Sequence, residues 1–396
     1  MERLGTYIEQ VYRTNADLRY GLDDVRGVSN TKEMMQSRAN LIGRTFEKFL
    51  VISPGDFVFN RRTTRNGEKI GMAFNNTERN YIFTEDYVAF KVKDDCKNVL
   101  LPEYLYLFFR RSEFDRYARY MSTGSATEFF NWEDMCNVPF APPAMEFQQK
   151  MVRAMSTLEH RIDVLQQIND NLVACIDAIF NKQFGTQKQL AEAYTPTSDL
   201  SSLPAAWKIS KASDFFDITI GKTPPRSEPE WFSNDREENE VWISIADMRT
   251  TSPFILDSSE YLTKEAVKKH NVKMVPANSV LLSFKMTVGR VAVVTSKVTT
   301  NEAIAHFPCD TELLPYVYSY LKSFNYAYLG STSSITTAIN SKIIKEMPFL
   351  MPSRAEIVLF NQRVSPMFTE LEKIARETAL LERTATMMLP QLLEMR

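Results

Sequence analysis

A long-period internal repeat constrains the fold of this chain more than any other feature. The stretch LPEYLYLFF at Leu101 matches LPYVYSYLK at Leu314, and FQQKMVRAMSTLEHRI at Phe147 matches FNQRVSPMFTELEKI at Phe360, both at the same offset. Between them, VPFAPP at Val138 matches MPFLMP at a nearly equal offset. Three matches in one order predict two copies of a single structural unit.

Each copy ends in a stretch with the apolar spacing of a coiled-coil helix. Apolar residues alternate at spacings of four and three, with Asn169 as a polar member of the first stripe. A helix of about 30 residues would be a rod of roughly 45 Å. A rod of that length favours helices that separate two domains over the alternative, two ordinary core-facing helices. The predicted helix-pair interface comprises Leu158, Ile162, Leu165, Asn169, Leu172, Ile176, Ile179, Leu371, Ile374, Thr378, Leu381, Ala385 and Met388.

These signals predict an α+β protein with two mixed α/β domains in tandem, each followed by a long helix. The two helices are expected to pair as an antiparallel coiled coil, with Pro366 and Pro390 kinking or delimiting the second one. The predicted boundaries are a first domain at 1–145, a helical spacer at 146–184, a polar linker at 185–206, a second domain at 207–353 and a second helical spacer at 354–396.

Composition narrows the class of protein. The 396 residues carry a formal net charge of −2, which argues against a protein that holds nucleic acid by electrostatics alone. The four cysteines are scattered and no histidine lies at zinc spacing, so neither a disulfide framework nor a metal site is expected. No stretch has the apolar length of a membrane span, and we expect a cytoplasmic protein with no membrane partner.

The stretch TIGKTPPRSEPEWF could be mistaken for a phosphate-binding loop, because Gly221, Lys222 and Thr223 stand in sequence. A phosphate loop needs an earlier glycine, where this chain has Phe216, and a helix directly afterwards. Two prolines follow Thr223 instead and block that helix. The stretch predicts a stiff, basic turn, and its tryptophan is expected to pack the domain.

Several motifs resemble the specificity (S) subunits of type I restriction-modification systems. They are GKTPPR followed by EWF and VWISIADM, the segment NSVLLSFKMTVGRVAVV, and the closing TMMLPQLL. The first half resembles a divergent target-recognition domain of that family, most clearly in SPGDFVFNRR and EKIGMAF. The order of domain, helix, domain, helix extends the resemblance over nearly the whole chain.

The resemblance implies a non-catalytic, sequence-specific DNA-recognition subunit. In that family each recognition domain reads one half of a bipartite, asymmetric site on double-stranded DNA, and the helices set the spacing. The expected partners are two methyltransferase (M) subunits, which would carry S-adenosylmethionine, and restriction (R) subunits with the motor and nuclease. No cofactor is expected in this chain, since methyltransferase and nuclease motifs are missing from its sequence.

The resemblance also points to DNA-contacting loops at equivalent places in the two halves. Arginine and lysine suit phosphates and guanine edges, while Ser, Thr and Asn suit both phosphates and bases. The candidate DNA-binding residues are Arg61, Arg62, Arg65, Asn66, Lys69, Ser125, Thr127, Asn131, Lys222, Thr223, Arg226, Lys285, Thr287, Arg290, Ser333, Thr336 and Asn340.

Two other functions remain open from the sequence. A coiled-coil adaptor would use the same architecture to bind proteins, and its basic loops would be solvated surface. A fused recognition and modification enzyme would need catalytic residues that only the fold brings together. For the Ser, Thr and Asn loops, the alternative to DNA contact is a turn held by its own hydrogen bonds.

Overall fold

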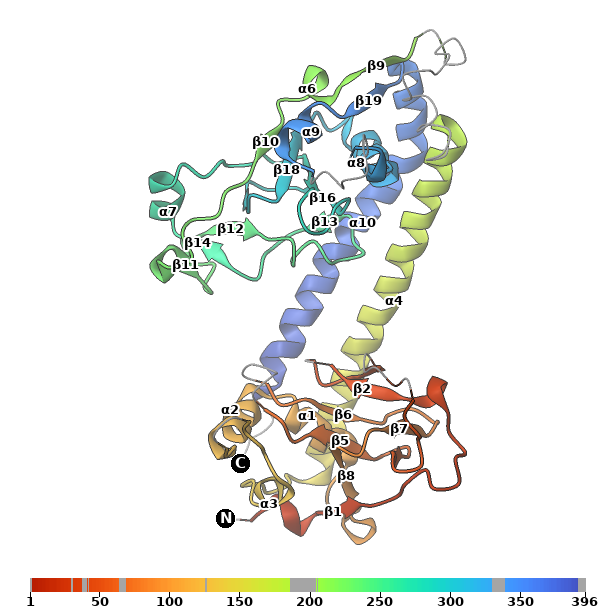
Figure 1. Cartoon of the computed structure of the whole chain (residues 1–396), viewed down its shortest axis with the longest axis vertical. Helices are drawn as coiled ribbons and strands as arrows, with labels where there is room; N and C mark the ends of the chain where they lie inside the picture. Colours follow the sequence, from red (N-terminus) through yellow and green to blue (C-terminus); the bar gives the residue numbers. More distant parts are fainter. Residues whose placement is uncertain are drawn as a thin grey trace. The chain divides into compact units, whose positions relative to one another are not determined.

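The chain divides into two compact units. The structure, a computed structural model, describes residues 2–29, 31–37, 41, 43–63, 69–124, 127–185, 204, 206–329 and 339–390. Unit 1 comprises Met1–Arg161 with Leu381–Arg396, and unit 2 comprises Ile162–Leu380. Each unit therefore contains one mixed α/β domain and a part of each long helix (Figure 1).

Unit 1 is built on an antiparallel sheet of order β1-β8-β5-β6, with the smaller pairs β2-β3 and β4-β7 beside it. The strands are β1 (Ile8–Val11), β2 (Arg26–Val28), β3 (Met34–Gln36), β4 (Leu50–Ile52), β5 (Phe57–Asn60), β6 (Met72–Phe74), β7 (Tyr81–Phe83) and β8 (Tyr87–Val92). The helices and 3-10 turns are η1 (Leu4–Thr6), η2 (Leu22–Asp24), η3 (Asp94–Cys96), α1 (Pro102–Phe109), α2 (Ser112–Met121), α3 (Trp132–Cys136) and the start of α4 (Met145–Phe184).

Strand β5 shows how the sequence sets the core of unit 1. Its residues Phe57, Val58 and Phe59 are all buried, although side chains alternate between the two faces of a strand. Phe57 and Phe59 pack with α1, α2 and the start of α4, whereas Val58 packs in a second cluster with Ile52 and Phe83. The central sheet therefore separates two apolar layers, which is why β5 has no polar face.

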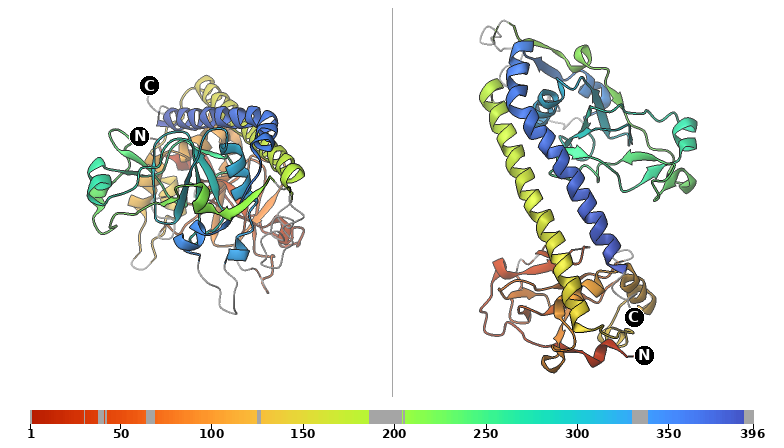
Figure 2. Two further views of the ribbon diagram at one scale, coloured as in Figure 1. Left: turned by 90° about the horizontal axis from the view of Figure 1, so that it is seen from above. Right: turned by 180° about the vertical axis from the view of Figure 1, so that it is seen from behind.

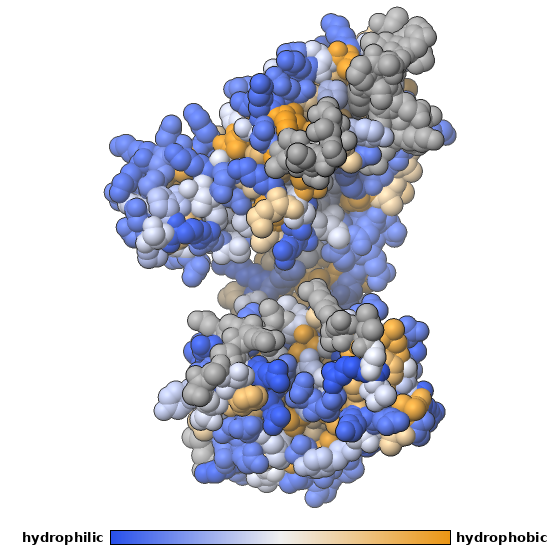
Figure 3. Space-filling view, viewed as in Figure 1, coloured by the Kyte–Doolittle hydropathy of each residue, from blue (hydrophilic) through white to orange (hydrophobic). Residues whose placement is uncertain are grey.

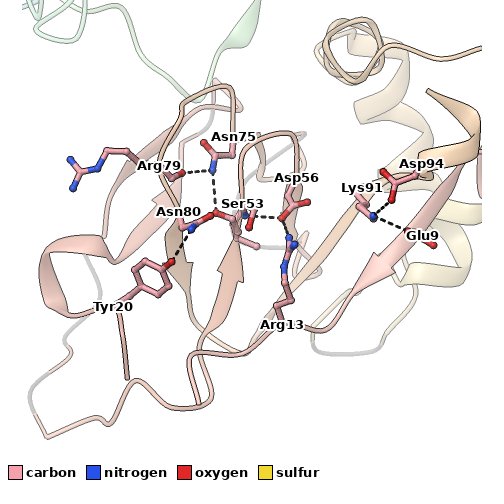
Figure 4. A network of polar contacts seen from close by, with 11 residues as sticks. Glu9, Arg13, Tyr20, Ser53, Asp56, Asn75, Arg79, Asn80, Lys91 and Asp94 are labelled. Carbon is pink, nitrogen blue, oxygen red and sulfur yellow. Dashed lines mark hydrogen bonds and ion pairs between the residues drawn. The ribbon is translucent and has the colours of Figure 1, made fainter. Parts of the chain in front are cut away.

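A network of buried polar groups fixes the turns at one edge of this sheet (Figure 4). The carboxylate of Asp56 is 3% exposed, pairs with Arg13 and accepts the backbone N–H of Ser53. The amide of Asn75 donates to the backbone oxygens of Ile52, at 3.1 Å, and Arg79, at 2.8 Å. These bonds satisfy backbone groups that would otherwise be buried without partners.

Unit 2 repeats the plan with more strands. Its main sheet has the order β10-β18-β15-β16-β13, a second sheet has the order β11-β14-β12-β17, and β19 pairs with β9. The strands are β9 (Lys208–Lys211), β10 (Thr219–Ile220), β11 (Phe232–Ser233), β12 (Glu240–Ile243), β13 (Phe254–Ile255), β14 (Tyr261–Leu262), β15 (Ser279–Ser283), β16 (Val291–Val294), β17 (Thr299–Thr300), β18 (Ile304–Pro308) and β19 (Pro348–Met351). The helices and 3-10 turns are α6 (Ala212–Phe215), η5 (Pro229–Trp231), α7 (Lys264–Lys269), α8 (Leu314–Ser323), η6 (Tyr326–Leu329), α9 (Ser341–Lys345) and α10 (Arg354–Met388).

The structure shows the repeat that the sequence predicted. The sheet orders β1-β8-β5-β6 and β10-β18-β15-β16 are equivalent, and both hairpins β5–β6 and β15–β16 are antiparallel. The layering is also repeated, since Val280 and Leu282 of β15 face the helices and Leu281 faces a separate cluster. A side-chain amide is also matched. Gln148 of α4 donates to Val99 O and Asn361 of α10 donates to Glu312 O, and each acceptor lies ahead of the matching helix α1 or α8.

Both long helices exceed the expected length, with 40 residues in α4 and 35 in α10. In unit 2 the end of α4 lies beside the start of α10, where Phe184 and Phe360 have ring centroids 5.4 Å apart (Figure 2). In unit 1 the start of α4 and the end of α10 share the cluster that holds Met155 and Met388. The helices thus run in opposite directions, and Pro366 stands inside α10 without ending it.

Most of the large apolar side chains are buried. Hydrophilic residues cover most of the face shown in space-filling form, with apolar residues between them in small groups (Figure 3). Among the described residues, no helix is both long and apolar enough to span a membrane.

Candidate nucleic-acid interface

In unit 1 the structure brings two predicted loops together. Arg61 and Arg62 follow β5, and a β-bridge joins Arg62 to Phe129. The backbone N–H of Phe130 donates to Arg61 O at 2.9 Å, and that of Thr63 donates to Glu128 O at 3.1 Å. The loop after β5 and the Ser/Thr loop before α3 therefore form one continuous surface.

The cations of this surface are held loosely. The guanidinium of Arg62 lies 3.9 Å from the Asp86 carboxylate, with both side chains about half exposed, and such pairs contribute little. Arg61 lies with its guanidinium 5.9 Å from the Phe129 ring centroid, and Lys69 is exposed. All three keep their positive charge accessible to an anion.

A buried ion pair fixes the far end of the basic loop. The carboxylate of Asp115 accepts the backbone N–H of Ile70 at 3.1 Å and pairs with Lys32 Nζ at 2.7 Å. Lys32 is 3% exposed and also donates to Phe109 O, and burial lowers its pKa although Asp115 opposes that shift. The sequence analysis missed this lysine, because nothing around it distinguishes it from a surface residue.

Some predicted contacts lie outside the described residues. These are Arg65, Asn66, Ser125, Ser333 and Thr336. Thr127 is described and is partly buried beside the bridged strand ends.

In unit 2 the stiff turn after β10 is fixed by β18 of the main sheet and β17 of the second sheet. The N–H groups of Gly221 and Lys222 donate to Ile304 O and Thr300 O. A Cβ on Gly221 would lie 2.1 Å from Asn301 O, so only glycine fits there. No helix begins directly after Thr223, as the two prolines predicted, and the first helical turn in this fully described stretch is η5 at Pro229. The Lys222 side chain is exposed.

Arg226 is more tightly engaged than the sequence suggested. Its guanidinium lies 3.9 Å from the ring centroid of Phe232 and 4.8 Å from that of Trp242, and it pairs with Glu260 at 2.8 Å. The stacked arginine thus stabilises the second sheet and keeps one exposed edge. The predicted packing role of Trp231 is confirmed, since it is 7% exposed, and Trp242 is likewise buried at 3%.

One carboxylate links the turn to the β15–β16 hairpin. Thr223 donates its hydroxyl to Glu302, which lies within electrostatic reach of both Lys285 and Arg226. Partial burial raises the pKa of Glu302, but the Thr223 hydrogen bond and the two cations hold it below its usual value. Residues predicted separately in two loops therefore form one surface in unit 2.

Three predicted residues have structural roles. Arg290 donates from Nη1 to Ile245 O at 2.7 Å, so its charge is tied to the backbone of the domain. Asn340 caps α9 by accepting the N–H groups of Lys342 and Ile343, and Asn131 caps α3, where its N–H donates to Asp134. For the two asparagines, these contacts favour the turn that the sequence analysis kept as an alternative to DNA contact.

Thr287 takes part in the β15–β16 hairpin mainly through its backbone. Its N–H donates to Lys285 O at 2.6 Å, and its oxygen accepts the hydroxyl of Ser283. These bonds shape the tip of the hairpin.

His306 ties β10, β17 and β18 together beneath the turn. It is fully buried, and its Nδ1 and Nε2 lie 2.8 Å and 2.7 Å from the hydroxyls of Thr219 and Thr300. Burial lowers its pKa to about 4. A neutral imidazole therefore supports β10, the strand that precedes the turn carrying Lys222.

The predicted helix-pair residues fall into three groups. Ile176 and Leu371 are buried in the core of unit 2, with Leu172 and Ile179 packed against it, and Ile374 is also buried. Leu158, Ala385 and Met388 pack against the core of unit 1. The remaining residues belong to neither core. Leu165 and Asn169 are buried, and the Asn169 amide lies 3.4 Å from the hydroxyl of Thr251, to which it donates. The half-buried residues are Ile162, Thr378 and Leu381.

The loop surfaces of the two units, around Arg61 and Arg62 in unit 1 and around Lys222 and Lys285 in unit 2, carry cations and hydrogen-bonding groups. Among the described residues, no group of three or more His, Cys, Asp or Glu side chains is placed to hold a metal ion. The arrangement suits contact with a polyanion.

Comparison with known proteins agrees with this architecture. The type I restriction modification DNA specificity domain matches residues 28–174 and again residues 204–383. The HindI specificity subunit of Haemophilus influenzae is 23% identical over 407 residues, covering 86% of this chain and 86% of that protein. The MjaIX specificity subunit of Methanocaldococcus jannaschii is 24% identical over 193 residues, covering 48% of this chain and 44% of that protein.

A solved structure shows the same fold. The type I restriction-modification S subunit from M. genitalium superposes with a TM-score of 0.53 at 13% identity, over 99% of this chain and 95% of that one. The two family matches fall on the two repeated halves and together span most of the sequence. The chain therefore belongs to the type I restriction-modification DNA specificity family, whose members recognise DNA sequence.

Proposed function

We propose that each unit reads one half of a bipartite, asymmetric site on double-stranded DNA. The observation that carries this proposal is the repeated main sheet, in which the hairpins β5–β6 and β15–β16 hold cations at equivalent places. Arg61 and Arg62 would serve the first half-site, and Lys222 and Lys285 the second. Because the two units differ in sequence and in their side sheets, the two half-sites would differ as well.

Companion subunits would supply chemistry and most of the affinity. A chain with a net charge of −2 lacks the positive excess that tight binding through phosphates needs. The Haemophilus relative is named as a subunit of a restriction enzyme. We infer a non-catalytic chain that works with two methyltransferase subunits carrying S-adenosylmethionine, and with restriction subunits.

The long helices are the proposed docking site for the methyltransferase subunits. Within unit 2, Val358, Leu359 and Leu380 of α10 and Ile168 of α4 expose apolar side chains to solvent. Contiguous exposed apolar patches, unlike single exposed residues, mark protein interaction sites, so the proposal requires that a methyltransferase subunit cover these residues together. Binding of a subunit there would bury them.

Alanine substitution of Arg61 and Arg62 tests the DNA-reading role. In complex with the methyltransferase subunits, the double variant should bind its site at least about thirtyfold more weakly, because each of the two lost base contacts is worth about 1–3 kcal/mol. Mapping of methylated adenines in the host should show relaxed sequence in one half of the site and an unchanged other half.

Lys97→Ala provides the matched control, since Lys97 is an exposed cation of unit 1 that pairs only locally with Asp94. It should leave both halves of the site unchanged. If the arginine variant keeps full affinity and selectivity, the basic loop does not read DNA and the adaptor function gains support.

A further inference from the structure

The tip of the β15–β16 hairpin presents an unusual residue. Met286 is 99% exposed and has a φ of 58°, a backbone conformation that residues other than glycine rarely adopt. The N–H of Thr287 donates to Lys285 O at 2.6 Å, which closes a three-residue turn around Met286. Such a turn with positive φ at its centre is rare and strained.

The strained tip is held from below by several contacts. Ser283 Oγ donates to Thr287 O at 2.6 Å and accepts the N–H of Arg290 at 3.0 Å. The N–H of Gly289 donates to Ser283 O at 2.9 Å, and a Cβ on Gly289 would lie 3.1 Å from the Tyr326 ring. The hairpin thus rests on Tyr326 and holds Met286 in one place.

An exposed apolar side chain is ordinary on a protein surface, but this one combines exposure with backbone strain. A strained residue persists only where the surrounding contacts impose it, and such residues cluster at functional sites. Met286 also follows Lys285, which shares the carboxylate of Glu302 with Arg226. An apolar tip surrounded by these charges suits a polyanion with an apolar interior, which describes stacked base pairs.

We propose that Met286 is a wedge that enters the base stack of the half-site read by unit 2 and opens one base step. This inference rests on the proposed DNA-reading function and goes further, by assigning a deforming residue. Apolar side chains that insert between base steps unstack them, and pyrimidine–purine steps yield most easily. The wedge would therefore select a deformable step without any hydrogen bond to a base.

The test uses the complex with methyltransferase subunits and a duplex that carries the site mapped in the host. 2-Aminopurine, whose fluorescence rises on unstacking, is placed in turn at each position of the second half-site other than the methylated adenine and its neighbours, because a methyltransferase unstacks that adenine by flipping it. The wild-type complex should raise the fluorescence at one step. Met286→Ala and Met286→Gly should abolish that rise and weaken binding about tenfold, or ~1.4 kcal/mol, whereas Met286→Leu should restore both.

Met274→Ala is the matched control, because Met274 is another partly exposed methionine of unit 2, outside this surface. It should leave fluorescence and affinity unchanged. The Gly variant also guards against misfolding: glycine tolerates positive φ, so its melting temperature should not fall.

The wedge is overturned if the wild-type complex binds its site selectively with no unstacked step in the second half-site, or if the same step still opens with Met286→Ala. Either result leaves the proposed function intact. Failure of the wild-type complex to prefer its mapped site over unrelated DNA would instead refute the proposed function.

Discussion

At the scale of single residues, His306 makes stability depend on pH. Its folded-state pKa is about 4 against an ordinary value of 6.5, so the unfolded chain binds the proton more readily. The stabilisation is complete above pH 6.5 and is lost as the pH falls towards 4, by up to about 3 kcal/mol. Wild type should exceed His306→Gln in unfolding free energy by more at pH 7 than at pH 4.5, as measured by urea unfolding.

Other groups also titrate in this range, so the comparison is between the two proteins at each pH. Thr300→Val is a useful companion, because it removes one hydroxyl partner while leaving the imidazole buried. A difference between wild type and His306→Gln that stays constant from pH 7 to pH 4.5 would contradict a depressed pKa.

Residue roles were the least predictable part of the candidate site. The sequence shows that Arg226 and Arg290 are cations, but their partners Glu260 and Ile245 lie far away along the chain. Only the fold reveals which cation is stacked or bonded to backbone. Met286 was missed for a related reason, since its positive φ is imposed by hydrogen bonds to Ser283 and its neighbours.

At the scale of elements, the long helices were predictable because their apolar spacing persists over many turns. The start of α4 at Met145 and that of α10 at Arg354 agree closely with the expected starts. The short strands β10, β11 and β13 carry only two residues each. Such strands are defined by pairing partners distant in sequence, which no local pattern records.

Helix length offers a test of the spacing role. One heptad added to both α4 and α10 at the boundary between the units, near Arg161 and Leu381, keeps the apolar stripes in phase and adds about 10 Å. If the helices set the distance between the units, the gap between the two methylated half-sites should lengthen. Mapping of methylated adenines measures the gap.

Seven residues inserted between positions 186 and 203, after the end of α4 at Phe184, form the control and should leave the gap unchanged. A helix-insertion variant that methylates sites with the original gap would show that the helices do not act as a ruler.

At the scale of the whole molecule, the repeat was the most informative feature of the sequence. It predicted two mixed α/β domains, each followed by a long helix, and the structure contains both pairs. What it did not reveal is that each compact unit includes the end of the other unit's helix. That exchange depends on side-chain packing between segments at opposite ends of the chain.

Deleting residues 381–396 should therefore disturb unit 1 and spare unit 2. Ala385, Met388 and Leu389 pack against the cluster containing Met151 and Met155, and their loss would expose it. Hydrogen–deuterium exchange should become faster in residues 145–161 and stay unchanged in the sheet of unit 2. Deleting only residues 391–396 is the control, and faster exchange in both units would contradict the expected division.

Because the end of α10 packs in unit 1, the order of residues along the gene differs from their grouping in the structure. A nonsense or frameshift mutation between codons 381 and 388 is distant from the first domain on the gene, yet it removes packing partners from that domain. Such a mutation would impair recognition of the first half-site. Mutational maps of this protein should therefore group changes at residues 381–390 with changes in unit 1.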